Sequence, residues 1–220
     1  MKNIQPPADV IFSIPTDLPI LQDDGACKHL ENMQIPNAFL WSTDEQEINL
    51  SSLSGWNVIF CYPMTGRPSV PIPEGWVQIP GAAGCTPQAC SYRDNHAELK
   101  RNGVGIYGIS TQTSEAQKEA SNRLGLPYPL LSDINHSFSS ALKLPMLEVS
   151  GSKLIKRLTL ILKDGVIKKC FYPVFPPDKN VVEVMDWLSE NKAQSDIPAD
   201  RLSASLVLSR RRQAAGELIR

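Results

Sequence analysis

Asn57-Val58-Ile59-Phe60-Cys61-Tyr62 is a continuous apolar run that ends at Pro63. Its length and composition are typical of a buried parallel strand. A second run of this kind, Gly105-Ile106-Tyr107-Gly108-Ile109, follows about forty residues later, and the pattern between the two runs indicates a helix over residues 86–101. A strand, a helix and a second strand in this order predict an α/β layer fold.

The segments on either side of this unit extend the same pattern. Residues 36–55 predict a hairpin and then a short helical turn. Asp164-Gly165, between two β-rich runs, is a strong signal for a second hairpin. Further helices are expected over residues 114–124, 137–142 and 181–188. The whole order predicts an α/β fold with a mixed central β-sheet flanked by helices.

The chain divides into three parts on composition. Residues 1–35 are proline-rich and form an expected N-terminal extension, residues 36–191 form the domain, and residues 192–220 form a C-terminal tail that contains three consecutive arginines. A run of charges is usually a solvated face. Within the domain, residues 63–84 form a long loop rich in proline and glycine, and such loops are usually functional or disordered.

Charge and hydropathy exclude several classes of protein. The net charge of -1 gives no reason to expect a nucleic acid as partner. No apolar run approaches the roughly 20 residues that a membrane span needs, and the first residues do not read as a secretory signal. We therefore expect a cytoplasmic protein with no membrane partner.

The 220 residues include five cysteines, Cys27, Cys61, Cys85, Cys90 and Cys170. An odd number in a cytoplasmic chain argues against a framework of structural disulfides, and the three histidines have no zinc-ligand spacing. Cys61 and Cys170 lie inside expected strands, so they are predicted to be inert. Cys27 is predicted to be an incidental thiol.

Cys85 stands where the long loop meets the expected helix. Free N–H groups and the helix dipole favour a thiolate at such a position, and the thiolate is the reactive form. Cys90 would lie about 7.5 Å along the helix and about 140° around it. Since a disulfide needs Cα atoms closer than about 7 Å, the two can pair only if the helix start unwinds. The residues alone leave open an inert Cys85 and a Cys90 that simply faces the core.

The segment Gly84-Cys85-Thr86-Pro87-Gln88-Ala89-Cys90-Ser91-Tyr92-Arg93-Asp94 resembles the active-site segment of the peroxiredoxin Q group, also called bacterioferritin comigratory proteins. The resemblance extends from about residue 36 to residue 189. It includes Gly108-Ile109-Ser110, Pro129-Leu130-Leu131-Ser132-Asp133 and Lys156-Arg157-Leu158-Thr159-Leu160.

This resemblance implies a thioredoxin-like fold, with Cys85 as the peroxidatic cysteine and Cys90 as the resolving one. It also implies that Arg157 supports the thiolate and the peroxide oxygens. The family has a threonine three residues before the peroxidatic cysteine, whereas this chain has Ala82 there. We hypothesise that Thr65 folds back over the site in its place, because a hydroxyl both donates and accepts hydrogen bonds.

The implied activity is the thiol-dependent reduction of hydrogen peroxide or alkyl hydroperoxides. Cys85 becomes a sulfenic acid, Cys90 resolves it to a disulfide, and a thioredoxin or glutaredoxin-type reductant recycles it without a metal or cofactor. The expected assembly is a monomer or homodimer. The alternatives are a redox-sensing or disulfide-exchange protein on the same fold, with little peroxide turnover, and a binding module that uses the long loop.

Overall fold

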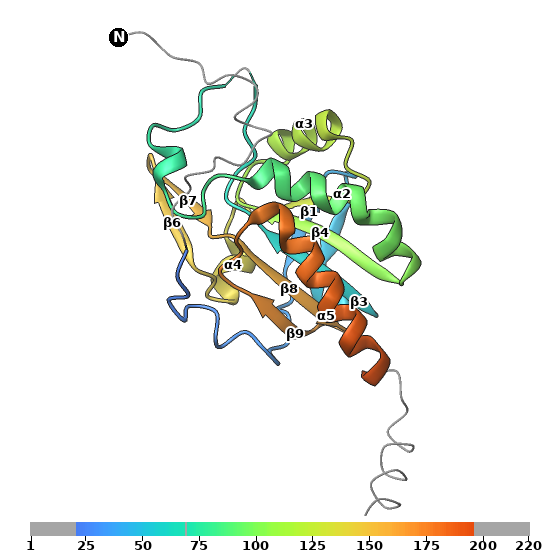
Figure 1. Cartoon of the computed structure of the whole chain (residues 1–220). Helices are drawn as coiled ribbons and strands as arrows, with labels where there is room; N and C mark the ends of the chain where they lie inside the picture. Colours follow the sequence, from blue (N-terminus) through green and yellow to red (C-terminus); the bar gives the residue numbers. More distant parts are fainter. Residues whose placement is uncertain (1–20, 69, 196–220) are drawn as a thin grey trace, which may run out of the picture. The chain divides into compact units, whose positions relative to one another are not determined.

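The computed structural model describes residues 21–68 and 70–195 (Figure 1). Within these ranges, a seven-stranded mixed sheet has the order β2-β1-β5-β4-β3-β8-β9. Strand β3 pairs in parallel with β4 and antiparallel with β8. The strands are β1 (Phe39–Ser42), β2 (Glu47–Asn49), β3 (Trp56–Cys61), β4 (Val104–Ser110), β5 (Leu130–Ser132), β8 (Leu158–Lys163) and β9 (Val166–Phe171). The predicted mixed central sheet is confirmed.

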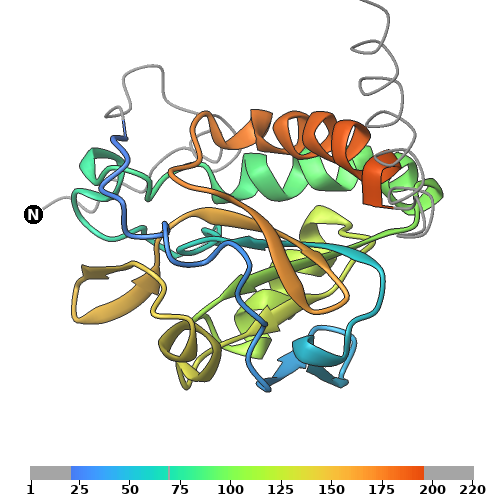
Figure 2. The same ribbon diagram turned by 90° about the horizontal axis from the view of Figure 1, so that it is seen from below.

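Strand β3 is buried along its whole length because both faces of the sheet are covered. On one face, the ring of Phe60 stacks on Tyr92 of helix α2 (Cys85–Arg101), with centroids 4.6 Å apart. On the other face, Ile59 and Cys61 share a core with Phe138 of helix α4 (Ser137–Ala141). Figure 2 shows α2 and α4 on opposite sides of the sheet.

The expected hairpins and helices lie where the sequence placed them. The Asp164-Gly165 turn joins β8 to β9, and β1 and β2 form the first hairpin before the 3-10 turn η1 (Leu50–Ser52). Helix α3 spans Ser114–Leu124, and Thr113 caps it by accepting a hydrogen bond from Ala116 N–H. Helix α5 (Asn180–Ser195) is longer at its C-terminal end than expected.

Two features were not predicted. Strand β5 has only three residues, too few to show a period. Strands β6 (Met146–Val149) and β7 (Ser152–Ile155) form a separate hairpin around Ser150 and Gly151, which both have positive φ. This hairpin packs with the long loop, which contains the 3-10 turn η2 (Trp76–Gln78), to form a second small core around Trp76, Ala82 and Leu154.

The chain ends add three facts. Leu30 and Ile35, from the expected extension, are buried in the main core. Contacts divide the chain at Val181, so α5 begins in the unit that holds the sheet and continues in a second unit. Residues 1–20 and most of the predicted tail lie outside the described residues. Among the residues that the structure describes, no helix is long and apolar enough to cross a bilayer.

Candidate active site

Cys85 is the first residue of α2, as the sequence predicted. The preceding Gly84 has φ 96°, a left-handed conformation that turns the loop sharply into the helix. No side chain caps this helix start. The first N–H groups of α2 and the positive end of its dipole therefore face the region around the Cys85 thiol. The Cys85 side chain is buried, with 3% of the residue exposed.

Arg157 reaches the Cys85 sulfur from the segment between β7 and β8. Its Nη2 lies 3.2 Å from Cys85 Sγ and donates to the carbonyl of Ala83 at 2.9 Å. Arg157 is itself buried, with 2% exposed, so water screens its charge little. A fixed guanidinium at this distance places a positive charge and N–H donors beside the sulfur.

Gln88 holds the arginine in place. Its Oε1 accepts a hydrogen bond from Arg157 Nη1, while its Nε2 donates to Asn180 Oδ1 at 3.2 Å. The same Asn180 oxygen accepts from the hydroxyls of Tyr92 at 2.8 Å and Thr159 at 2.6 Å. The sequence analysis assigned Gln88 no role. The sequence signal for such a role was the spacing: Gln88 follows Cys85 by three residues, which puts both side chains on one face of the helix.

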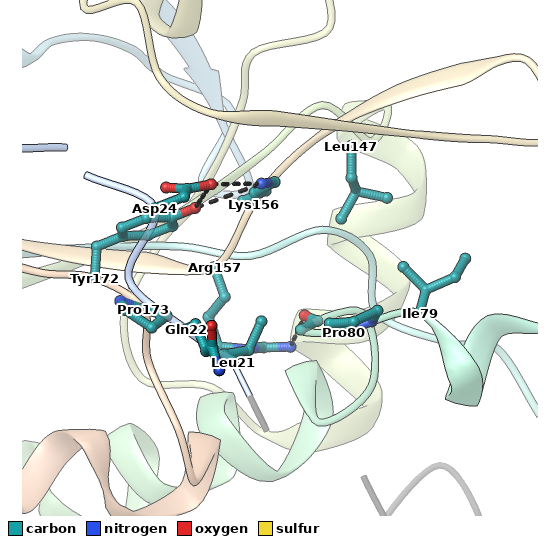
Figure 3. Close-up of a pocket in the computed structure, with 11 residues that line it drawn as sticks. Leu21, Gln22, Asp24, Ile79, Pro80, Leu147, Lys156, Arg157, Tyr172 and Pro173 are labelled. Atoms are coloured by element: carbon teal, nitrogen blue, oxygen red, sulfur yellow. Dashed lines mark hydrogen bonds and ion pairs between the residues drawn. The ribbon is translucent and has the colours of Figure 1, made fainter. Parts of the chain in front are cut away.

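Two cavities border these groups. A narrow one of about 30 Å³ is lined by Cys85, Thr86 and residues of the long loop, including Met64, Ile72 and Trp76. A larger one of about 450 Å³ lies beside Arg157 (Figure 3). There, Lys156 Nζ contacts Asp24 Oδ2 at 3.2 Å, and Tyr172 donates to the same carboxylate at 3.1 Å. The thiol is thus reached through the loop side of the site.

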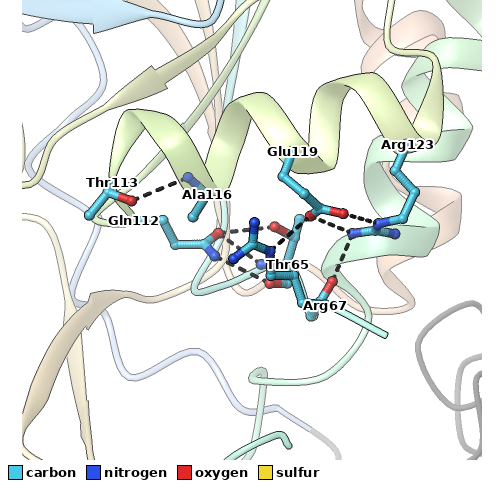
Figure 4. Close-up of polar contacts among 8 residues, drawn as sticks. Thr65, Arg67, Gln112, Thr113, Ala116, Glu119 and Arg123 are labelled. Atoms are coloured by element: carbon cyan, nitrogen blue, oxygen red, sulfur yellow. Dashed lines mark hydrogen bonds and ion pairs between the residues drawn. The ribbon is translucent and has the colours of Figure 1, made fainter. Parts of the chain in front are cut away.

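Thr65 lies in the first part of the long loop, and its hydroxyl is directed to Gln112 (Figure 4). The Thr65 N–H and Oγ1 donate to Gln112 Oε1 at 2.9 and 3.1 Å, and Gln112 Nε2 donates back to the Thr65 carbonyl at 3.2 Å. Arg123 of α3 donates to the carbonyl of Gly66 at 2.8 Å. These bonds fasten the loop to α3 and to the turn before it, and the neighbours Met64 and Gly66 line the cavity at Cys85.

We expect Thr65→Val to lower the free energy of unfolding by about 1 kcal/mol, because one side-chain hydrogen bond is lost. The rate of Cys85 oxidation should fall by no more than about threefold, since the hydroxyl acts on the loop through Gln112. Urea titration and stopped-flow oxidation measure the two effects, and Gln112→Ala is the matched variant. A loss of about 100-fold in the oxidation rate, as expected when a donor beside a developing charge is removed, would instead place the Thr65 hydroxyl at the reacting sulfur.

Cys90 lies within the same helix, half-buried, and both cysteines are free thiols. Burial raises the pKa of the Cys90 thiol. Tyr128 donates to the carbonyl of Ala89 at 2.6 Å. This hydrogen bond holds α2 in place between the two cysteines. Arg93 forms an ion pair with Asp94 at 2.8 Å. The folded state therefore keeps Cys90 away from Cys85.

Comparison with known proteins identifies the family of this chain. The redoxin family model matches residues 30–185, most of the chain. The chain belongs to the redoxin family. This redoxin is 27% identical over 154 residues to peroxiredoxin Q, chloroplastic, of Oryza sativa subsp. japonica, which covers 70% of this chain and 64% of the relative. With the corresponding protein of Suaeda salsa it is 28% identical over 156 residues, with 70% and 65% covered. The chain thus spans slightly less than two thirds of the length of these relatives.

Solved structures agree on the fold. Peroxidoxin BcpB from Mycobacterium tuberculosis superimposes with a TM-score of 0.59 at 22% identity, covering 73% of this redoxin and 97% of that chain. A mutant of Xanthomonas campestris peroxiredoxin Q gives 0.57 at 20% identity, with 73% and 98% covered. The thioredoxin-like fold and the resemblance to the peroxiredoxin Q group are confirmed.

Gly84 offers a test of how the helix start of this redoxin is built. A Cβ on Gly84 would meet Pro177 Cγ at 2.5 Å, in addition to the cost of the positive φ. We expect Gly84→Ala to lower the free energy of unfolding by about 3 kcal/mol. Gly103→Ala is the matched control, because its φ is 67° with nothing within 4 Å, and should cost about 1 kcal/mol. Equal losses in urea titrations would show that Pro177 yields freely.

Cys61 and Cys170 lie in strands β3 and β9, and their predicted placement in strands is confirmed. Cys61 is fully buried, and its burial raises its pKa. Cys27, expected to be incidental, lines one cavity together with Cys170. No group of three or more metal-binding side chains exists among the residues that the structure describes.

Proposed function

We propose that this redoxin is a thiol-dependent peroxidase that reduces hydrogen peroxide and organic hydroperoxides at Cys85. One observation carries the proposal: Arg157 Nη2 lies 3.2 Å from Cys85 Sγ at an uncapped helix start. A nucleophile, a fixed positive charge and free N–H donors are the groups that cleavage of an O–O bond requires. The names of the relatives, which are peroxiredoxins, support the same activity.

In the first step, the Cys85 thiolate attacks the terminal peroxide oxygen. The S–O bond forms as the O–O bond breaks, so the sulfur is oxidised to a sulfenic acid and the other oxygen leaves as water or an alcohol after taking a proton. The guanidinium of Arg157 and the N–H groups at the start of α2 stabilise the negative charge that develops on the leaving oxygen. We assign both Cys85 and Arg157 as catalytic residues.

The narrow cavity at Cys85 has a volume of about 30 Å³, which is room for a molecule of about the size of water. Met64, Ile72, Trp76 and Val77 line it together with Cys85. This volume suits hydrogen peroxide or the terminal peroxide group of an organic hydroperoxide, whose alkyl part must lie outside the cavity. In this proposal Thr65 is a positioning residue, because its bonds to Gln112 hold the loop that supplies Met64.

In the second step, Cys90 attacks the sulfenic acid, an intrahelical disulfide forms, and water leaves. The helix start must first unwind, which breaks the Arg157–Gln88 and Tyr128–Ala89 hydrogen bonds. An external dithiol of the thioredoxin or glutaredoxin type then reduces the disulfide by exchange. We propose that residues 36–191 form the domain that carries out this cycle; the cytoplasmic location and the oligomeric state remain predictions.

The direct test is oxidation of the reduced protein by stoichiometric hydrogen peroxide. We expect Cys85 to be oxidised at least about 1000-fold faster than a free cysteine, because the site stabilises the transition state. Stopped-flow fluorescence and mass spectrometry of the products follow the reaction. Oxidation at the rate of a free thiol would contradict the proposal.

A redox-sensing or disulfide-exchange function remains the second candidate, favoured by one observation. The Thr65 hydroxyl is bound to Gln112, while Ala82 stands at the position where the family has a threonine. The two functions differ in turnover. With excess peroxide, thioredoxin, its reductase and a nicotinamide reductant, a peroxidase turns over many times, whereas a sensor is oxidised once.

A further inference from the structure

Two cysteines outside the Cys85 site come together from distant parts of the sequence. Cys27 lies in the turns that follow Gly25, and Cys170 lies in β9. Both side chains line the same cavity and pack in the same hydrophobic core. Cys27 is buried, with 5% exposed, whereas Cys170 is half-buried. The peroxide chemistry proposed above uses neither residue.

The backbone holds this pair together. Asn32 N–H donates to the Ile167 carbonyl at 2.8 Å, Ile167 N–H donates to the Met33 carbonyl at 2.9 Å, and Ile35 N–H donates to the Gly165 carbonyl at 2.8 Å. These bonds align residues 32–35 with β9, and Cys27 shares the main core with the strands. The nearness of the two cysteines therefore follows from how the backbone of the two segments is paired.

Charged groups beside the pair strengthen the same attachment. Glu31 Oε1 accepts from Lys169 Nζ at 3.0 Å and from the Cys170 N–H at 3.4 Å. Cys27 and Cys170 also line one surface cavity of about 320 Å³, together with Lys28, Glu31 and Lys169. A small molecule that enters this cavity meets both cysteines, of which Cys170 is the more exposed.

The two thiols are chemically unequal. The neighbouring Cys170 thiol and burial raise the pKa of Cys27, so Cys27 keeps its proton. A more exposed sulfur near a buried, protonated thiol is suited to thiol–disulfide exchange. The accessible sulfur attacks first, and the buried one completes the reaction.

We propose that Cys27 and Cys170 form a second redox-active dithiol, which closes to a disulfide by exchange with a low-molecular-weight disulfide. The Cys170 thiolate attacks one sulfur of that disulfide, forms a mixed disulfide and releases one thiolate. Cys27 then loses its proton and attacks the Cys170 sulfur, which releases the second thiolate. Two protein thiols are oxidised, one small disulfide is reduced to two thiols, and the protons pass to those thiols.

The bond would fasten the segment before β1 covalently to β9. Asp24 and Tyr172, which lie close in sequence to the two cysteines, form part of the wall of the cavity beside Arg157 (Figure 3). Closing the disulfide therefore fixes that wall. Because the bond closes a loop of more than a hundred residues, it should raise the melting temperature by about 10 °C.

The experiment uses the full chain with Cys85→Ser and Cys90→Ser, which leaves Cys27, Cys61 and Cys170 as the cysteines. The protein is equilibrated in buffers of reduced and oxidised glutathione, quenched with acid, alkylated and digested. We expect a linked peptide that joins Cys27 to Cys170, with Cys61 alkylated only after unfolding. Addition of Cys170→Ser should abolish both the link and the rise in melting temperature, whereas Cys61→Ser should preserve both.

Three results would overturn the inference. The first is stable glutathionylation of Cys170 with Cys27 still free. The second is a link that joins Cys61, and the third is a Cys27–Cys170 link that forms only in denaturing urea. None of these readouts involves peroxide turnover, so failure here is distinguishable from failure of the proposed peroxidase activity.

Discussion

Cys85→Ser should lower the rate of peroxide reduction by at least about 1000-fold, because a serine hydroxyl stays protonated and is a far weaker nucleophile. The site otherwise remains intact: serine fits the volume of the thiol, and Arg157 keeps its bonds to Ala83 and Gln88. The loss should therefore appear in the chemical step. Stopped-flow oxidation and steady-state turnover with a thioredoxin system measure it.

Cys90→Ser is the matched variant, since it changes the same atom five residues along the same helix. It should keep the fast first oxidation and lose turnover with the dithiol reductant. Its product should be a Cys85 sulfenic acid, trapped with dimedone and identified by mass spectrometry. In the unsubstituted chain, peroxide should give a Cys85–Cys90 link. A link from Cys85 to Cys61, or between two chains, would contradict the resolving role of Cys90.

The parts of this fold that the sequence predicts are those determined by local signals. Asp164-Gly165 predicts the hairpin β8–β9 because the turn chemistry is contained in two residues. Helix α3 begins at Ser114 because Thr113 caps it. Cys85 falls at a helix start because a loop with Gly84 ends there and Pro87 is accepted in the first turn.

The features that the sequence misses are produced by contacts between distant residues. Gln88 looks like an ordinary helical residue until Arg157 and Asn180 are placed on either side of its amide. Cys27 and Cys170 are separated by most of the domain, so neither residue predicts the other. Strands β6 and β7 had a local signal in Ser150-Gly151, but their partner is the long loop, whose packing no periodicity indicates.

Arg157→Met should slow the oxidation of Cys85 by about 100-fold, the size of effect seen when one preorganised donor is removed from a developing charge. Methionine keeps much of the buried volume and removes the charge and all N–H donors. Arg157→Lys should lose less, since it keeps a charge but cannot donate to Ala83, Gln88 and the sulfur in one fixed fork. Stopped-flow oxidation by hydrogen peroxide ranks the three proteins.

Stability must be separated from chemistry in this comparison, because Arg157 is buried and its removal leaves the Gln88 and Ala83 oxygens without their donor. We expect a cost of about 1–3 kcal/mol in the free energy of unfolding. Arg93→Met is the control, since Arg93 lies on α2, the helix that begins at Cys85, and pairs with Asp94 near the surface. Its oxidation rate should stay within about twofold of the unsubstituted chain. If Arg157→Met lost stability but oxidised at an unchanged rate, Arg157 would be a structural residue, and the charge beside Cys85 would not drive the reaction.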